Sequence, residues 1–198
     1  MTTRIAFVNG KGGVGKTTCS TLLAAALRDA GQGVSIEDRD PQKSATTAAA
    51  IFGLPAGGGE SIVIIDTAPN IQLPDTLDVI RNADLVILVT TPSPLDLATT
   101  AATAELIKAE RTGPTRILFN LVQTNNRSFE QMPAIAKELP FPTFKNFLVR
   151  RTSYQTAQVQ GWKSIPAALR EEVVRLAVEL ARALPQPDTV GQSDNRTL

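Results

Sequence analysis

The chain has 198 residues, of which 42% are hydrophobic and 20% are charged, a composition typical of a single soluble globular domain. Its net charge of +1 provides no overall attraction to nucleic acid or to a membrane surface. With one cysteine, Cys19, and no histidine, the chain excludes a disulfide framework, a Cys/His metal site and a histidine general base. Its chemistry must therefore depend on carboxylates, lysines or a metal ion held by oxygen ligands.

Apolar runs of strand length alternate with segments of helical period along the chain. The first expected strand, at residues 5–8, precedes a glycine-rich loop and a helix at residues 16–29. Further strands are expected at 34–36, 61–65, 85–89 and 116–121, and further helices at 44–52, 74–82, 94–110, 130–139 and 167–184. Strands this rich in apolar residues are typical of a parallel sheet covered by helices on both faces.

The sequence therefore predicts one α/β domain over residues 1–184 and a flexible polar tail at 185–198. The amphipathic helix at 167–184 is expected to pack on the sheet, although such a helix can also lie on a membrane. The apolar stretch at residues 5–8 is too short for a signal peptide, and no run is long enough to cross a bilayer. We therefore expect a cytoplasmic protein.

Residues 10–17 read G-K-G-G-V-G-K-T and match the phosphate-loop pattern G-x-x-x-x-G-K-[ST] between an expected strand and an expected helix. Glycines let the backbone curl around phosphate oxygens, and the helix N-terminus adds its positive end. We expect Lys16 to reach the β- and γ-phosphates of a nucleotide and the Thr17 hydroxyl to bind Mg²⁺. The expected nucleotide-binding residues of the loop are Gly12, Gly13, Val14, Gly15, Lys16, Thr17 and Thr18.

Two acidic motifs follow expected strands. Residues 38–42 read D-R-D-P-Q, and residues 62–66 read I-V-I-I-D, with Asp66 at the end of its strand. The carboxyl ends of parallel strands lie beside the phosphate loop, where carboxylates can hold Mg²⁺ and orient an attacking water. We expect Asp66 to bind Mg²⁺ through a water molecule.

K-G-G-V-G-K-T-T at residues 11–18 resembles the deviant phosphate loop of the ParA/MinD family of ATPases, and D-R-D-P-Q resembles the switch of its partition members. The resemblance implies a P-loop NTPase fold, ATP and Mg²⁺ as cofactors, and a homodimer that forms with ATP. It also implies that Lys11 acts in trans on the partner's phosphates, that Asp40 positions the attacking water, and that Asp38 supports the metal ion.

Later stretches are similar to small plasmid-partition members of the family, so that the resemblance spans residues 4–184. Residues 91–96 resemble a loop at their dimer contact, Asn120 matches an asparagine that reads the adenine edge, and residues 150–157 resemble their R-x-x-Y-x-x-A stretch. Only residues 43–61 separate the two acidic motifs, where the family commonly has a helix, a strand and another helix. The sheet is therefore expected to be one strand shorter than in the family.

By this resemblance the chain is a slow, partner-stimulated partition ATPase that binds DNA non-specifically, associates with the nucleoid and responds to a ParB-like adaptor. The expected DNA contacts belong to a stretch without acidic residues between 139 and 170, and they are Lys145, Arg150, Arg151 and Lys163. Four alternatives stay open: a MinD-like membrane ATPase, a protein-cargo positioning ATPase, a metabolic P-loop enzyme and a nucleotide switch that barely hydrolyses. The Pro/Asp/Gln-rich residues at 185–198 are unsuited to a membrane helix.

Overall fold

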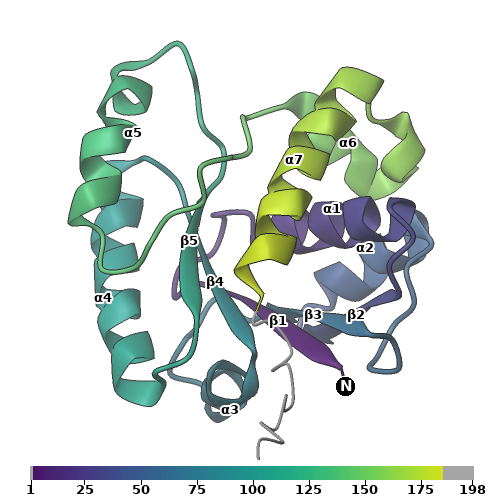
Figure 1. The fold of residues 1–198 in the computed structure, drawn as a ribbon, viewed down its shortest axis with the longest axis horizontal. Coiled ribbons are helices and arrows are strands. Elements are labelled where there is room, and N and C mark those ends of the chain that lie inside the picture. The colour runs from purple at the N-terminus through teal and green to yellow at the C-terminus, as the bar shows by residue number, and fades with distance from the viewer. Residues whose placement is uncertain (1, 185–198) are drawn as a thin grey trace, which may run out of the picture.

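The structure is a computed structural model that describes residues 2–184, and these residues form a five-stranded, fully parallel sheet (Figure 1). The strand order is β2-β3-β1-β4-β5. The strands are β1 (Thr3–Val8), β2 (Val34–Arg39), β3 (Ile62–Thr67), β4 (Leu85–Thr90) and β5 (Thr115–Phe119). This architecture confirms the predicted α/β fold of P-loop NTPases, whereas the tail predicted at 185–198 lies outside the described residues.

Helices cover both faces of the sheet, as Figure 1 shows. One face carries α1 (Lys16–Asp29), α2 (Ser44–Phe52), α6 (Thr152–Gln160) and α7 (Ala167–Ala183). The other face carries α3 (Pro74–Asn82) and α4 (Pro94–Glu110), and α5 (Arg127–Glu138) packs beside β5. Because α7 contacts α1 above the sheet, its apolar side is buried within the domain, as expected for 167–184.

Successive residues of the central strand enter opposite cores. Ile5 and Phe7 pack with α1 and α7, whereas Ala6 and Val8 pack with α3 and α4, and all four are fully buried. A strand with helices on both sides needs apolar residues at every position, which explains the uninterrupted apolar runs of the sequence.

The segment between β2 and β3 contains α2 and no strand. Its extended part forms a single parallel bridge, in which Ala56 pairs with Ile36 at the edge of the sheet. The sheet therefore ends at β2 on this side, as the short spacing of the two acidic motifs predicted.

One helix was not predicted. The helix α6 buries only Tyr154 and Ala157, so its apolar residues show no helical stripe, and a 3₁₀ turn, η1 (Trp162–Ser164), follows it. No helix among residues 2–184 is long and apolar enough to cross a membrane.

Candidate nucleotide and magnesium site

The phosphate loop connects the carboxyl end of β1 to the first turn of α1. Gly13 and Gly15 have φ angles of 82° and 89°, in the left-handed region that favours glycine. A Cβ atom at Gly15 would lie 2.1 Å from Nδ2 of Asn120, so a larger residue would also displace that side chain. The loop therefore adopts the curled backbone that the sequence predicted.

Lys16, Thr17 and Asp66 come together below this loop. The Thr17 hydroxyl donates to the carboxylate of Asp66 at 2.6 Å, and the ammonium group of Lys16 donates to the backbone oxygen of Lys11 at 3.3 Å. Asp66 is fully buried at the end of β3, and Lys16 is 7% exposed. Two of the three expected metal residues, Thr17 and Asp66, thus meet the expected phosphate lysine at the carboxyl ends of β1 and β3.

Burial disfavours the charged forms of both Asp66 and Lys16 in this cluster. Burial raises the pKa of Asp66 to about 7, with help from Asp38 and Asp40 and against the effects of Thr17 and Lys16. Burial also lowers the pKa of Lys16, although Asp66 and Asp40 oppose that change. A cation beside Asp66 and an anion beside Lys16 would each favour the charged form of its neighbour.

The hollow above these residues has a volume of about 470 Å³ and is lined by the loop glycines, Lys16, Thr17, Thr18, Asp40 and Gln42. Donors from the loop and from Lys16 suit phosphate oxygens. One buried carboxylate beside a hydroxyl suits Mg²⁺, which proteins usually hold through one or two carboxylates together with substrate phosphates. The residues present therefore fit a nucleotide with its magnesium ion, with Thr17 and Asp66 as the metal-side ligands.

The two aspartates of the D-R-D-P-Q segment have different surroundings. Asp38 lies beside Asp66 in the register of β2 and β3, but its carboxylate accepts hydrogen bonds from the backbone N–H of Asp40 at 3.0 Å and of Thr46 at 2.7 Å. Among the described residues, the carboxylate of Asp40 accepts only the local backbone bond from Gln42 at 3.0 Å, and Asp40 lines the phosphate hollow. Asp38 thus anchors the first turn of α2, while Asp40 is placed toward the hollow.

Lys11 is held by its own chain. Its ammonium group forms an ion pair with Asp96, whose other carboxylate oxygen accepts from the Thr91 hydroxyl at 2.5 Å. These contacts hold the pKa of Asp96 below its usual value, although burial opposes the shift. The sequence predicted that residues 91–96 lie at a dimer contact but did not pair Asp96 with Lys11. The sequence feature that could have drawn attention to Asp96 is its place in the first turn of a helix that begins at Ser93-Pro94.

Asn120 supports the loop from below. Its amide donates to the backbone oxygen of Val14 at 2.9 Å, and the residue is 3% exposed. The next residue, Leu121, has a φ of 54°, which is uncommon for a non-glycine residue and marks a constrained turn. The expected adenine contact of Asn120 stays a prediction, and the structure adds a second role for this side chain in holding the loop.

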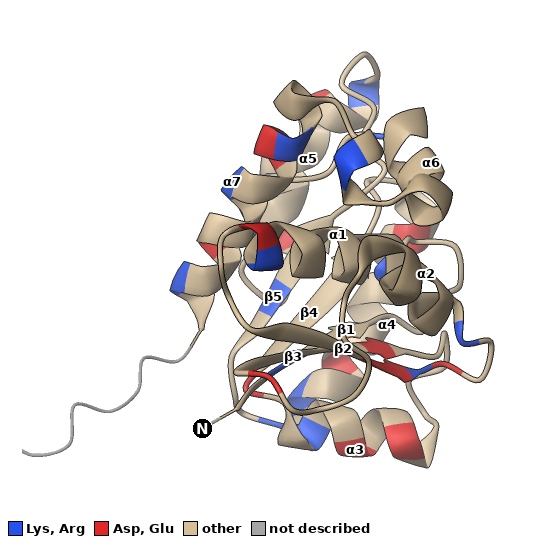
Figure 2. Ribbon diagram, turned by 90° about the vertical axis from the view of Figure 1, so that its right-hand side faces the viewer, with Lys and Arg blue, Asp and Glu red and all other residues tan. Residues whose placement is uncertain are grey.

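The four expected DNA-binding residues do not form one patch. Arg150 lines a hollow of about 270 Å³ with Gly13 and Asp96, whereas Lys163 lines another hollow with Arg28. Glutamates of α7 lie near the other two: Glu179 accepts from the backbone N–H of Lys145 at 2.7 Å, and Glu172 lies 4.0 Å from Arg151. Figure 2 shows acidic and basic positions interspersed along the ribbon on the side of α2 and α6.

The fold and the phosphate site together define a P-loop nucleotide-binding protein. Residues 5–162 match the family described as the CobQ/CobB/MinD/ParA nucleotide binding domain, and the chain belongs to this family.

Two curated relatives have the same description, maintenance of carboxysome distribution protein A. The one from Gloeobacter kilaueensis is 32% identical over 90% of this chain and 94% of its own length. The one from Halothiobacillus neapolitanus is 27% identical over 79% of this chain and 84% of its own length.

Solved structures share the fold at lower identity. A plasmid partition protein from Borrelia burgdorferi B31, bound to AMPPNP, has a TM-score of 0.70 and 14% identity and covers 92% of this chain and 98% of its own. The septum site-determining protein MinD from Pyrococcus horikoshii OT3, complexed with Mg-ADP, has a TM-score of 0.68 and 18% identity, with 91% and 95% coverage. These neighbours share the fold of this chain; the first is described with a nucleotide analogue and the second with a nucleotide and magnesium.

Proposed function

We propose that this chain is a positioning ATPase that dimerises with ATP, binds DNA non-specifically and hydrolyses ATP slowly when an adaptor protein stimulates it. The observation that carries the proposal is the pair of lysines in the phosphate loop: Lys16 is buried and lines the phosphate hollow, whereas the ammonium group of Lys11 is paired with Asp96, which lines a different hollow. An ordinary phosphate loop needs only one of these lysines. A second, releasable cation suits charge neutralisation across a dimer.

Each residue of the site has a role in hydrolysis. Lys16 binds the β- and γ-phosphates, and Asp40 orients the water that attacks the γ-phosphorus while the β–γ bridging oxygen leaves with ADP. Mg²⁺, held at Thr17 and Asp66, would neutralise charge on the β- and γ-oxygens. Lys11 from the partner would place a further positive charge beside the negative charge that develops on the leaving oxygen, as an arginine finger does in other NTPases.

The cargo we favour is a protein assembly rather than a plasmid. Both curated relatives described above are named for carboxysome distribution, and one of them is 32% identical over 90% of this chain. Plasmid partition is the second candidate, since the sequence resembles small partition ATPases in residues 91–96 and 150–157.

The biochemical test measures phosphate release and molecular mass by light scattering, with ATP and Mg²⁺. The wild type should form dimers and turn over ATP. Lys16→Ala should lose ATP binding, and Lys11→Ala should bind ATP as a monomer without turnover. Lys137→Ala, an exposed residue of α5, serves as the matched control. A wild type that stays monomeric with ATP, or a Lys11→Ala variant that dimerises and hydrolyses normally, would contradict the proposal.

A cellular test separates the two cargo classes. Cells in which Lys16→Ala replaces the wild type should misplace a protein assembly and keep normal plasmid inheritance. Loss of plasmids with normally distributed protein assemblies would favour the partition candidate instead.

A further inference from the structure

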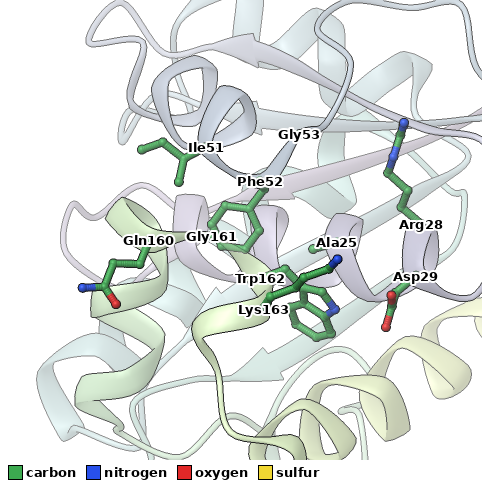
Figure 3. A pocket seen from close by; sticks show the side chains of 10 residues that line it. All are labelled: Ala25, Arg28, Asp29, Ile51, Phe52, Gly53, Gln160, Gly161, Trp162 and Lys163. Atoms are coloured by element: carbon green, nitrogen blue, oxygen red, sulfur yellow. The ribbon is translucent and has the colours of Figure 1, made fainter.

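A second pocket lies at the end of α1 opposite the phosphate loop. It has a volume of about 490 Å³, and its walls are the last turn of α1, the end of α2 and the junction of α6 with η1 (Figure 3). The 14 residues of α1 separate it from the phosphate loop by about 20 Å at 1.5 Å per residue. The pocket is therefore separate from the nucleotide site.

An unused hydrogen-bond donor lies in this pocket. Trp162 is 7% exposed, and its indole N–H is buried without a hydrogen-bond partner among residues 2–184. Figure 3 shows the nitrogen edge of the ring turned toward the side on which Arg28 and Asp29 lie, with the ammonium group of Lys163 above it in this view. Buried polar groups in native proteins almost always have a partner, so this donor would favour an acceptor bound in the pocket.

The charges around the indole suit a carboxylate-bearing peptide. Arg28, Lys163 and Asp29 line the pocket, and none of them forms an ion pair with another described residue. Two cations and the indole donor favour an anion, while Asp29 would repel the continuous negative charge of a nucleic acid. A peptide offers both a carboxylate for the cations and backbone N–H groups for Asp29.

The apolar part of the wall also suits a peptide. Phe52 and the ring of Trp162 line the pocket, and Ile51 at its edge is 38% exposed. Together they can hold an apolar side chain next to the carboxylate.

The helix α2 connects this pocket with the switch. Its last turn lines the pocket, and its first turn holds Asp38 through the backbone N–H of Thr46 at 2.7 Å. Gly161 packs so closely on the end of α2 that a Cβ atom there would lie 2.9 Å from the backbone oxygen of Ile51. Because of this close packing, a ligand that changed the spacing between α2 and η1 would act on the helix that holds Asp38.

We propose that this pocket, formed by Arg28, Phe52, Trp162 and Lys163, binds an acidic peptide segment of a protein partner, and that α2 transmits its occupancy to the Asp38–Asp40 switch. The transmission through α2 rests on the ATPase function proposed above. Peptide binding does not rest on it, because it can be tested with nucleotide-free protein.

Trp162 is the single tryptophan of the chain, so its fluorescence reports on the pocket. The probe is an N-acetylated, C-amidated tetrapeptide, L-E-F-E, with L-Q-F-Q and L-K-F-K as neutral and basic counterparts. In nucleotide-free protein, L-E-F-E should change the emission saturably and bind at least ten-fold more tightly than either counterpart. Arg28→Gln/Lys163→Gln should weaken binding at least ten-fold, whereas the exposed pair Lys137→Gln/Arg182→Gln should not. In wild-type protein with ATP, L-E-F-E should change turnover at least two-fold.

Equal binding of L-Q-F-Q, or full binding by Arg28→Gln/Lys163→Gln, would overturn the peptide site. If a random-sequence DNA duplex displaced L-E-F-E, and if its binding depended on Arg28 and Lys163, the pocket would be a nucleic-acid site and the peptide proposal would be wrong. Peptide binding without a change in turnover would overturn the transmission through α2. A failure of the ATPase proposal would instead appear as absent turnover with intact, charge-dependent peptide binding.

Discussion

The ammonium group of Lys11 lies against the carboxylate of Asp96 within one chain, although 85 positions separate the two residues. The Thr91 hydroxyl fixes the other oxygen of that carboxylate at 2.5 Å. If Lys11 acts on the phosphates of a partner subunit, it must leave Asp96 when the dimer forms. The ion pair then competes with dimerisation.

Asp96→Asn should therefore lower the ATP concentration at which the protein is half dimeric. The Lys11 side chain is 36% exposed, so solvent weakens the ion pair. We expect the pair to oppose dimerisation by about 1 kcal/mol at most, which corresponds to roughly a five-fold change in the half-dimeric ATP concentration. Light scattering over an ATP titration measures it. Glu105→Gln, which removes an exposed ion pair with Lys108 on α4, is the control. An unchanged or higher ATP requirement would show that Asp96 does not restrain Lys11.

Asp40→Ala should bind ATP but turn it over at least about 100-fold more slowly, because general-base and water-positioning groups contribute about that much or more. The dimer formed with ATP should then persist. Phosphate release and the decay of light scattering after removal of free ATP measure the two effects. Asp75→Ala, which changes an exposed carboxylate paired with Arg39, should leave both unchanged. Normal turnover by Asp40→Ala would assign water positioning to another residue.

Glu179 provides a pH-dependent contribution to stability. Burial opposes its ionisation, but hydrogen bonds from the backbone of Lys145 and from the backbone and side chain of Asn146 outweigh that effect and hold the pKa of Glu179 below its usual value. A lowered folded-state pKa stabilises the folded protein above the unfolded-state pKa, and this stabilisation is lost as the pH falls through the folded-state pKa.

Glu179→Gln should therefore reduce the free energy of unfolding by about 1 kcal/mol at pH 7 and by much less at a pH below the folded-state pKa of Glu179, where the wild-type carboxyl is also protonated. Urea unfolding at the two pH values measures the difference. Glu171→Gln, on an exposed part of the same helix with an Arg175 contact at 3.8 Å, should change stability little at either pH. An equal loss at both pH values would show that the effect of Glu179→Gln is not one of ionisation.

Retention of random-sequence duplex DNA should depend on ATP and fall with salt at a slope of about −0.9 per phosphate neutralised. Arg150→Ala/Arg151→Ala should make that slope shallower by about two, since each contact contributes about one. Lys137→Ala/Arg182→Ala removes the same amount of positive charge elsewhere on the molecule and should leave the salt slope unchanged. Because Arg150 lies near Gly13, ATP binding by the double variant is measured alongside. An unchanged salt slope would remove the DNA contact from these arginines.

The features that the sequence determined by itself depend on residues that are adjacent in the chain or on a regular spacing of apolar residues. Residues 10–17 contain the glycines, the lysine and the threonine of the phosphate loop in one continuous segment, so their spacing alone predicts the loop. Strands covered on both faces are rich in apolar residues, which made all five recognisable, although the polar end of β2 at residues 37–39 was not predicted as strand. The helices α1, α2, α3 and α4 begin and end at the predicted residues. The roles of Asp40, Lys11 and Asn120 in catalysis and binding stay predictions.

Other features were decided only by the tertiary structure, because they join residues that are distant along the chain. The acid-free stretch between 139 and 170 suggested one basic face, but α7 brings Glu172 and Glu179 next to it. The pairing of Lys11 with Asp96 requires β1 and β4 to lie side by side, and the Trp162 pocket requires α1, α2 and α6 to converge. Local patterns contain no information about such contacts, since folding brings these residues together only when the helices bury their apolar sides on the sheet.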